Sequence, residues 1–314
     1  VLRHNSGNAT TPYTLTTSET IPANITLKVE RGAIIDISTG IVLTMNSRPI
    51  AGDYKIFECA DVTGNVVGMQ SVLASWFGVS PDATALVNAA ALGKAIQAAK
   101  DGEVNFVAET YSLGTVPDID VPVTLNFNNS TINADTAGIV LHINLVLYVS
   151  QTVIIKDLNF LKKVGTTDPA NFIKISHENN MILENIRGYG LTATHSLIYS
   201  YTSVATHLRN VVFETCTAPY AFYFNHDSSG STIYTTAIDL DHIRLGAITG
   251  VGIYNKAIDF VMRGKSVVEI CSGGGILFPD PATRISITDS YFETNTGFDI
   301  HFSNDNPVEP TNAD

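Results

Sequence analysis

A repeat of short apolar segments between Val153 and Asn304 is the feature that most constrains this chain. Six segments align without gaps, and their fifth residues are 28, 25, 32, 22 and 25 residues apart. The segments are VIIKDLNF (153–160), MILENIRG (181–188), THLRNVVF (206–213), IDLDHIRL (238–245), FVMRGKSV (260–267) and ISITDSYF (285–292). A period in this range is typical of a solenoid, in which each repeat buries its apolar face against its neighbours.

Apolar residues recur at alternate positions in these segments, which is the period of a strand with one buried face. The residues two positions before the fifth are all apolar, namely Ile155, Leu183, Leu208, Leu240, Met262 and Ile287. The fifth residues are Asp157, Asn185, Asn210, His242, Gly264 and Asp289. Because these types tolerate a left-handed backbone, we expect each of them to turn the chain between two short strands.

A further strand is predicted after each segment. The strands are FIKIS (172–176), SLIYS (196–200), AFYFN (221–225), GIYNK (252–256), GILFP (275–279) and DIHFS (299–303). Read from Ile173, Leu197, Phe222, Ile253, Ile276 and Ile300, the steps are 24, 25, 31, 23 and 24 residues, close to those of the first set. Two sets of strands with matching steps predict an all-β fold, a right-handed parallel β-helix.

Composition excludes several classes of protein. The net charge of −12 argues against nucleic acid as a partner, because such binding needs a basic face. No run approaches the roughly 18 apolar residues that would span a membrane. Cys59, Cys216 and Cys271 are unevenly spaced and show no metal-ligand pattern. We therefore expect no metal, no cofactor, no nucleic acid and no membrane insertion.

Four regions are expected along the chain. Residues 1–75 are a β-rich N-terminal segment, and residues 76–102 are a linker followed by a helix. Residues 103–304 form the β-helix, and residues 305–314 are a polar tail or a linker to a further part.

The helix is predicted within residues 80–102. Ser80 is a suitable N-cap, Pro81 suits the first turn and Gly102 follows the end. Its apolar stripe is expected to consist of Leu86, Ala90, Ala95 and Ile96. We expect this helix to cap the N-terminal end of the β-helix, where core and strand edges would otherwise be exposed.

The order of motifs around this helix resembles a known family. Trp76-Phe77-Gly78-Val79, an Ala-rich helix and EVNFVAETYSLG (103–114) follow one another, after PANITLKVERGAIID (22–36). This order is similar to the pectate-lyase-like β-helix of bacteriophage tailspikes, over roughly residues 20 to 304. Two departures are the reduced Ser80-Pro81-Asp82 sequence and Glu109, which stands where glycine is common in the family. The motifs of the pectin-cleaving relatives are absent from the sequence.

The resemblance implies a homotrimer, located in a virion tail or outside the cell. It further implies binding of a bacterial capsular or O-antigen polysaccharide, and often its cleavage by a glycosidase or lyase. A fold alone does not decide catalysis. A non-catalytic fibre or adhesin on the same scaffold is the main alternative, and a secreted cellular polysaccharide lyase is a third.

The first candidate site lies on the outward positions around the fourth segment. Asp239 and Asp241 stand about 6.5–7 Å apart on one strand face, at the lower end of the range for inverting glycosidases. His207 and Arg209 are expected one coil earlier, and Arg263 one coil later. Asp239 is interpreted as a base kept ionised by His207, with the arginines holding Asp241 or an acidic sugar, which would also suit a lyase. The alternative is a structural row of alternating charges.

A second candidate cluster follows the later strand of three successive repeats. It consists of His177, Glu178, Tyr201, His226 and Asp227, with Glu178 and Asp227 about 9.6 Å apart across two coil spacings. Catalytic carboxylates at Glu178 and Asp227, with Tyr201 and His226 binding substrate, are one interpretation. A solvated turn is the other.

Beside this cluster, one outward stripe of apolar and aromatic residues is expected. It consists of Lys174, Ile198, Tyr223, Tyr254, Leu277 and His301. Exposed rings of Tyr223 and Tyr254 would bind the CH faces of sugars, or would form the interface of the homotrimer.

Overall fold

The computed structural model describes residues 1–5, 9–59, 66–145, 151–162, 165, 167–176, 180–225, 235–279 and 284–303. The chain divides into two compact units. The first is built mainly from Val1–Thr136, Val140–Leu145 and Thr152–Thr167, and the second mainly from Asp168 onward. The expected polar tail at 305–314 lies outside the described residues.

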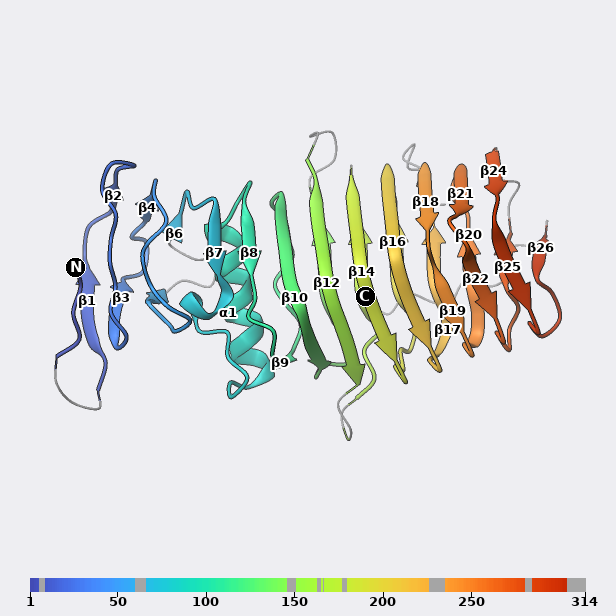
Figure 1. Ribbon diagram of the computed structural model, residues 1–314, viewed down its shortest axis with the longest axis horizontal. Coiled ribbons are helices and arrows are strands. Elements are labelled where there is room, and N and C mark those ends of the chain that lie inside the picture. Colours follow the sequence, from blue (N-terminus) through green and yellow to red (C-terminus); the bar gives the residue numbers. More distant parts are fainter. Residues whose placement is uncertain are drawn as a thin grey trace. The chain divides into compact units, whose positions relative to one another are not determined.

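The described residues of the first unit form parallel strands, one 3-10 helix and one α-helix (Figure 1). Its elements are β1 (Thr11–Leu15), β2 (Glu19–Ile21), β3 (Ala33–Ile37), β4 (Leu43–Met45), β5 (Phe57–Cys59), β6 (Val66–Val67), β7 (Ser71–Leu73), η1 (Ala74–Phe77), α1 (Ala85–Ala98), β8 (Glu103–Asn105), β9 (Thr110–Leu113), β10 (Val123–Ala134), β11 (Ile139–Asn144) and β12 (Val153–Lys162). The strands stack in the orders β1-β3-β5, β2-β4-β6 and β7-β8-β10-β12, and β9 pairs with β10. Thr11 pairs with Ala33 and Glu19 with Leu43, so the N-terminal segment, expected only to be β-rich, also repeats at solenoid spacing.

The second unit continues the same pattern with further parallel strands (Figure 1). They are β13 (Asn171–Ser176), β14 (Met181–Tyr189), β15 (Ser196–Tyr201), β16 (Ala205–Glu214), β17 (Thr217–Asn225), β18 (Ala237–Asp241), β19 (Arg244–Gly246), β20 (Thr249–Asn255), β21 (Asp259–Arg263), β22 (Ser266–Glu269), β23 (Ile276–Phe278), β24 (Arg284–Ile287), β25 (Ser290–Glu293) and β26 (Ile300–Phe302). Three stacks result: β14-β16-β18-β21-β24, β16-β19-β22-β25 and β13-β15-β17-β20-β23-β26. The predicted all-β parallel solenoid is confirmed, and its right-handed sense stays a prediction.

The predicted turns are confirmed at all six fifth residues. Their φ angles are 58° at Asp157, 56° at Asn185, 51° at Asn210, 56° at His242, 72° at Gly264 and 49° at Asp289. A left-handed residue at each of these positions bends the chain between two strand segments of one coil, as β18 and β19 on either side of His242 illustrate.

The core of the second unit contains the predicted apolar column. Leu183 pairs with Leu208, Leu208 with Leu240, and Leu240 with Met262, and all four side chains are fully buried. In the first unit, Ile155 is also fully buried and pairs with Leu125. Alternation of period two therefore placed the core face of these strands correctly.

The helix begins later than predicted. Thr84 is the N-cap of α1, and its side chain accepts a hydrogen bond from the backbone N–H of Val87. Ser80 instead closes a turn ahead of the helix, because its carbonyl accepts from the N–H of Ala83. Leu86 is largely exposed, so its predicted place in the apolar stripe is wrong. The buried residues of α1 include Ala85, Ala89 and Leu92, together with Ala95 and Ile96, which were predicted for the stripe.

The helix packs between elements that lie before and after it in sequence. It contacts β6, β7 and η1, which precede it in the sequence, and β9, which follows it. Parallel strands therefore precede the helix as well as follow it, and its role as an N-terminal cap stays a prediction.

Candidate functional site

Three neighbouring strands of the second unit carry the first candidate site. His207 on β16 pairs with Asp239 on β18, and Arg209 pairs with Asp241, which pairs in turn with Arg263 on β21. The two outward rows predicted from the repeat are therefore in register. Parallel pairing places neighbouring members of a row about 4.8 Å apart.

Asp239 is contacted by a basic side chain on each side. Its Oδ2 accepts a hydrogen bond from Arg263 Nη2 at 2.9 Å and lies 3.3 Å from His207 Nδ1. Its Oδ1 is buried and has no hydrogen-bond partner among the described residues. The Asp239 side chain is 19% exposed, so it is less accessible than a base on the outward face was expected to be.

Asp241 is the more open carboxylate of the two. Its side chain is 28% exposed, and its Oδ1 lies 2.7 Å from Nδ1 of His242, an exposed side chain. Arg263 approaches Asp241 only to 4.0 Å, so it binds Asp239 rather than Asp241 as its main partner. His242, which was predicted only as a turn residue, therefore lies in the candidate site.

Gly264 provides the space that the Asp241–His242 pair occupies. A Cβ atom at this position would lie 2.0 Å from Asp241 Oδ1 and 2.7 Å from His242 Nδ1. Glycine is thus needed at position 264 for the pair as well as for the left-handed turn.

Arg209 completes the cluster as an unpaired cation. Its side chain is exposed, and no described residue forms an ion pair with it. An arginine beside a carboxylate–imidazole pair is suited to binding an anionic group, because its planar guanidinium matches a carboxylate.

Most of the second candidate cluster lies outside the described residues. The residues outside the description are His177, Glu178, His226 and Asp227. The distance between the Glu178 and Asp227 carboxylates therefore stays a prediction. Tyr201 is half-buried, and its ring centroid lies 6.0 Å from that of Tyr199.

The predicted outward stripe is confirmed as one row at Tyr223, Tyr254, Leu277 and His301, but it is wrong at Ile198 and in the exposure of its tyrosines. Ile198 pairs with Ile173 and Phe222 in the core, so Tyr199 occupies the row of Lys174 and Tyr223. Tyr223 and Tyr254 are only 2% and 1% exposed, with their rings stacked at 4.5 Å. Neither ring is open to a sugar or to another subunit in this structure.

His195 packs against part of the buried cluster formed by Tyr199, Tyr223 and Tyr254. Its ring lies 5.0 Å from that of Tyr199 and 4.9 Å from that of Tyr223. Its Nδ1 lies 3.3 Å from Asn171 Nδ2, an amide that can only donate, so the neutral imidazole fits. Burial, together with the charge of Lys174, lowers the pKa of His195.

Acidification is expected to destabilise this cluster. Because the pKa of His195 is lower in the folded state, the unfolded chain binds more protons below about pH 6.5, and stability falls as the pH decreases through that value. Urea unfolding of the wild type should show this decrease, and His195→Gln should show a smaller one. His301→Gln, a change at an exposed histidine, is the control. Equal pH dependence in the wild type and His195→Gln would contradict this role.

A row of ion pairs on β16, β19 and β22 was not singled out from the sequence. Arg244 donates to Glu214 at 2.5 Å and to Glu269 at 2.8 Å. Gly246 lies in register between the two glutamates, so one arginine bridges two coils. All three charges are satisfied by one another, which is the arrangement of a structural row.

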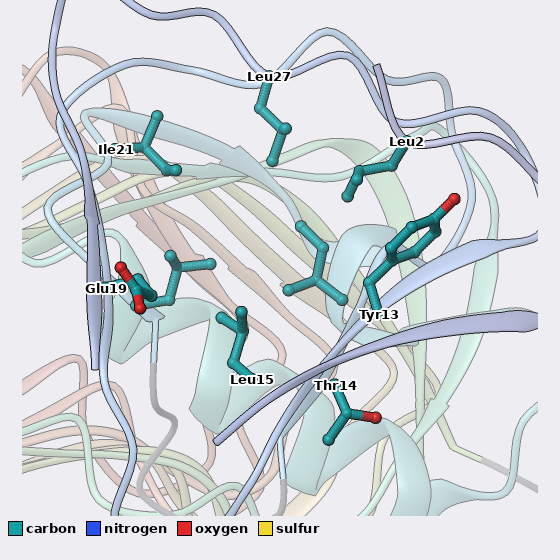
Figure 2. A pocket seen from close by; sticks show the side chains of 9 residues that line it. Leu2, Tyr13, Thr14, Leu15, Glu19, Ile21 and Leu27 are labelled. Atoms are coloured by element: carbon teal, nitrogen blue, oxygen red, sulfur yellow. The ribbon is translucent and has the colours of Figure 1, made fainter. Parts of the chain in front are cut away.

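An apolar cavity opens at β1 and β2, the end strands of their stacks (Figure 2). In Figure 2 the side chains of Leu2, Leu15, Ile21 and Leu27 surround one space, with Glu19 as the single charged group. The cavity offers no convergent set of polar groups, so it supports no chemistry.

The described residues include neither a metal-binding cluster nor a membrane-spanning helix. No group of three or more His, Cys, Asp or Glu side chains in this part of the chain is arranged to hold a metal ion. Across the same residues, none of the helices has the length and apolar character needed to cross a membrane.

Comparison with known proteins identifies no matching protein family and no matching curated protein. The similarity to tailspikes therefore remains a resemblance of motifs, and the function has to be inferred from the geometry of the site.

Proposed function

We propose that this protein binds an acidic bacterial surface polysaccharide and cleaves it at the Asp241–His242 pair. The observation that carries this proposal is the combination of an accessible carboxylate–imidazole pair with an unpaired arginine beside it. Arg209 would bind the carboxylate of an acidic sugar, and Asp241 would act as the base. In an elimination the base would remove a ring proton as the glycosidic C–O bond breaks. In a hydrolysis it would deprotonate the water that displaces the glycosidic oxygen. In both cases the leaving oxygen would take up a proton from solvent.

Asp239 takes a different role from the one the sequence favoured. Because its Oδ1 is buried and its Oδ2 is held by His207 and Arg263, Asp239 is a positioning residue. It would hold Arg263 within 4.0 Å of Asp241, on the side where the substrate would bind.

The wider assignment follows the tailspike resemblance. We propose a capsular or O-antigen polymer as the partner, a virion tail or the cell exterior as the location, and α1 as a cap. The homotrimer stays a prediction from this resemblance, and Tyr223 and Tyr254 do not support it because both are buried within the chain.

A non-catalytic adhesin is the second candidate function. The contacts of Asp239 with His207 and Arg263 favour it, because paired polar and charged groups on a sheet surface also serve structure alone. Arg209 would then bind the polymer without any bond being broken.

A panel of capsular and O-antigen polysaccharides separates these two functions. We expect one acidic polymer to be shortened, with new reducing ends from hydrolysis or unsaturated uronate absorbance from elimination. Neutral polymers serve as the matched control. Binding of an acidic polymer that stays intact would establish the adhesin and contradict cleavage.

A further inference from the structure

Two unpaired arginines lie on neighbouring strands of the second unit. Arg187 on β14 and Arg209 on β16 are exposed, and neither forms an ion pair or a side-chain hydrogen bond with a described residue. The other three arginines of this unit are each bound to a carboxylate, namely Arg244, Arg263 and Arg284. Because the chain has 30 acidic residues and 18 basic ones, two neighbouring arginines without a carboxylate indicate a site for an external anion.

The strand register gives the spacing of the two arginines. Arg209 pairs with Glu184 on β14, and Arg187 lies three residues further along that strand. Three residues of strand span roughly 10 Å. The two arginines therefore lie on either side of the corner formed by Asn185 and Asn210, whose side chains are hydrogen-bonded to each other. This separation suits anionic groups on two separate sugars rather than the two oxygens of one carboxylate.

Two carboxylates lie near these arginines, and they do not cancel the positive charge. Glu214 on β16 is already bound by Arg244. Glu184 is in register with Arg209, but the two side chains form no ion pair. The surface that carries Arg187 and Arg209 therefore keeps a net positive charge, which attracts an anionic polymer.

Tyr189 adds an aromatic surface beside Arg187. It lies two residues further along β14 on the same outward face, and the residue is 63% exposed. The tyrosines of the predicted outward stripe, in contrast, are buried within the chain. An exposed ring on a strand face can pack against the CH face of a sugar.

These residues follow one another from the proposed cleavage site. Asp241 on β18 pairs with Arg209 on β16, and Arg187 and Tyr189 come next on β14. From the coil and strand spacings, the path from Asp241 to Tyr189 is roughly 20 Å long. A path of this length holds several sugars of one polymer in a row.

We propose that Arg209 and Arg187 bind carboxylates on two separate sugars of one acidic polymer, and that Tyr189 packs against a sugar beside them. Arginine suits this role because its planar guanidinium binds a carboxylate through two parallel hydrogen bonds. This inference rests on the proposed function, because it places further sugars of the same polymer next to Asp241. It adds two binding residues and the spacing of the anionic groups.

Isothermal titration with one polymer in two chemical forms tests this inference. The first probe is the acidic polymer that the wild type binds in the panel of capsular and O-antigen polysaccharides. The second is the same polymer after chemical reduction of its carboxylates to alcohols. Asp241→Asn serves as the parent protein, so that the polymer stays intact during the titration.

Arg187→Gln in this parent should weaken binding of the native polymer about tenfold or more, the scale of one hydrogen bond between charged groups. It should leave the weaker binding of the reduced polymer unchanged. Equal affinity of the parent and Arg187→Gln for the native polymer would overturn the proposal. So would an equal loss for both forms of the polymer, because the carboxylate would then not be what Arg187 binds.

Lys100→Gln is the matched control for charge. Lys100 is exposed, lies in the first unit and has no described side-chain partner. Its replacement should leave the affinity for the native polymer unchanged. A loss equal to that of Arg187→Gln would show a general effect of net charge and overturn the assignment.

Tyr189→Ala should weaken binding of both forms of the polymer, because a ring packed against a sugar does not require the carboxylate. Tyr291→Ala, a change at another exposed tyrosine of the same unit, is the matched control. Equal effects of the two tyrosine variants, or a loss for the native polymer alone, would overturn the role of Tyr189.

The outcomes separate this inference from the proposed cleavage. Cleavage by Arg187→Gln with the KM of the wild type would overturn the Arg187 subsite and leave the assignment of Asp241 intact. A polymer that is bound through Arg187 but never shortened would support the subsite and contradict cleavage. Failure of every acidic polymer in the panel to bind would overturn both.

Discussion

Leu208→Asp is expected to abolish soluble folding of the protein. Leu208 is fully buried, with Leu183 on one side and Leu240 on the other. A carboxylate here would have apolar neighbours above and below, and an unpaired buried charge costs several kcal/mol. Domains are stable by only about 5–15 kcal/mol in total. In a solenoid, moreover, a coil that fails to form removes the template for the next one.

The measurement is the soluble yield of the variant, followed by circular dichroism of any soluble fraction. Val212→Asp is the matched control, because Val212 lies on the same strand but faces outward, in register with Arg187 and Arg244. A new carboxylate between two arginines should be tolerated. Native spectra from soluble Leu208→Asp would contradict the internal column.

The turns of the solenoid could be predicted where residue chemistry marks them. Asp157, Asn185, Asn210 and Asp289 are types that adopt positive φ at low cost, and the structure confirms them. A second column of positive φ at Thr215, Ala247, Ile270 and Thr294 was missed. These types give no such signal.

Backbone hydrogen bonds between coils hold this second column. The N–H of Thr215 donates to the carbonyl of Gly246 at 2.9 Å, and that of Ile270 to the carbonyl of Glu293 at 3.0 Å. A β-branched residue such as Ile270 is strained in this conformation, so contacts distant in sequence decide it. No pattern within one repeat could have revealed it.

The register of SLIYS could not be read from its sequence. All five residues are buried, so the alternation that fixes strand faces is absent, and both Leu197 and Ile198 fit the core row. A shift of one residue reverses every side chain of a strand. That shift moved Ile198 into the predicted outward stripe in place of Tyr199.

The positions of the candidate-site residues on neighbouring strands could be predicted, but their side-chain contacts could not. Pairing placed His207 beside Asp239 and Arg209 beside Asp241, as the repeat indicated. Arg263 donates to Asp239 rather than to Asp241, its partner in register. This contact depends on the conformation of the long arginine side chain, which the repeat spacing does not determine.

Asp241→Asn is expected to lower turnover of the cleaved polysaccharide by at least ~10²-fold, the usual scale for losing an acid–base group. The change is nearly isosteric and affects a partly exposed side chain, so folding should be retained. Asp118→Asn is the matched control, since Asp118 contacts His142 Nδ1 at 2.8 Å in the other unit and accepts from Asn144. It loses a similar aspartate–histidine contact far from the proposed chemistry in sequence.

The measurement that tests the proposed function most directly is therefore the initial rate of polymer cleavage by the wild type, Asp241→Asn and Asp118→Asn, at equal concentrations of folded protein. We predict rapid cleavage by the wild type and Asp118→Asn, and a rate at least ~10²-fold lower for Asp241→Asn with binding of the polymer retained. Full activity of Asp241→Asn would contradict the assignment of this carboxylate as the base.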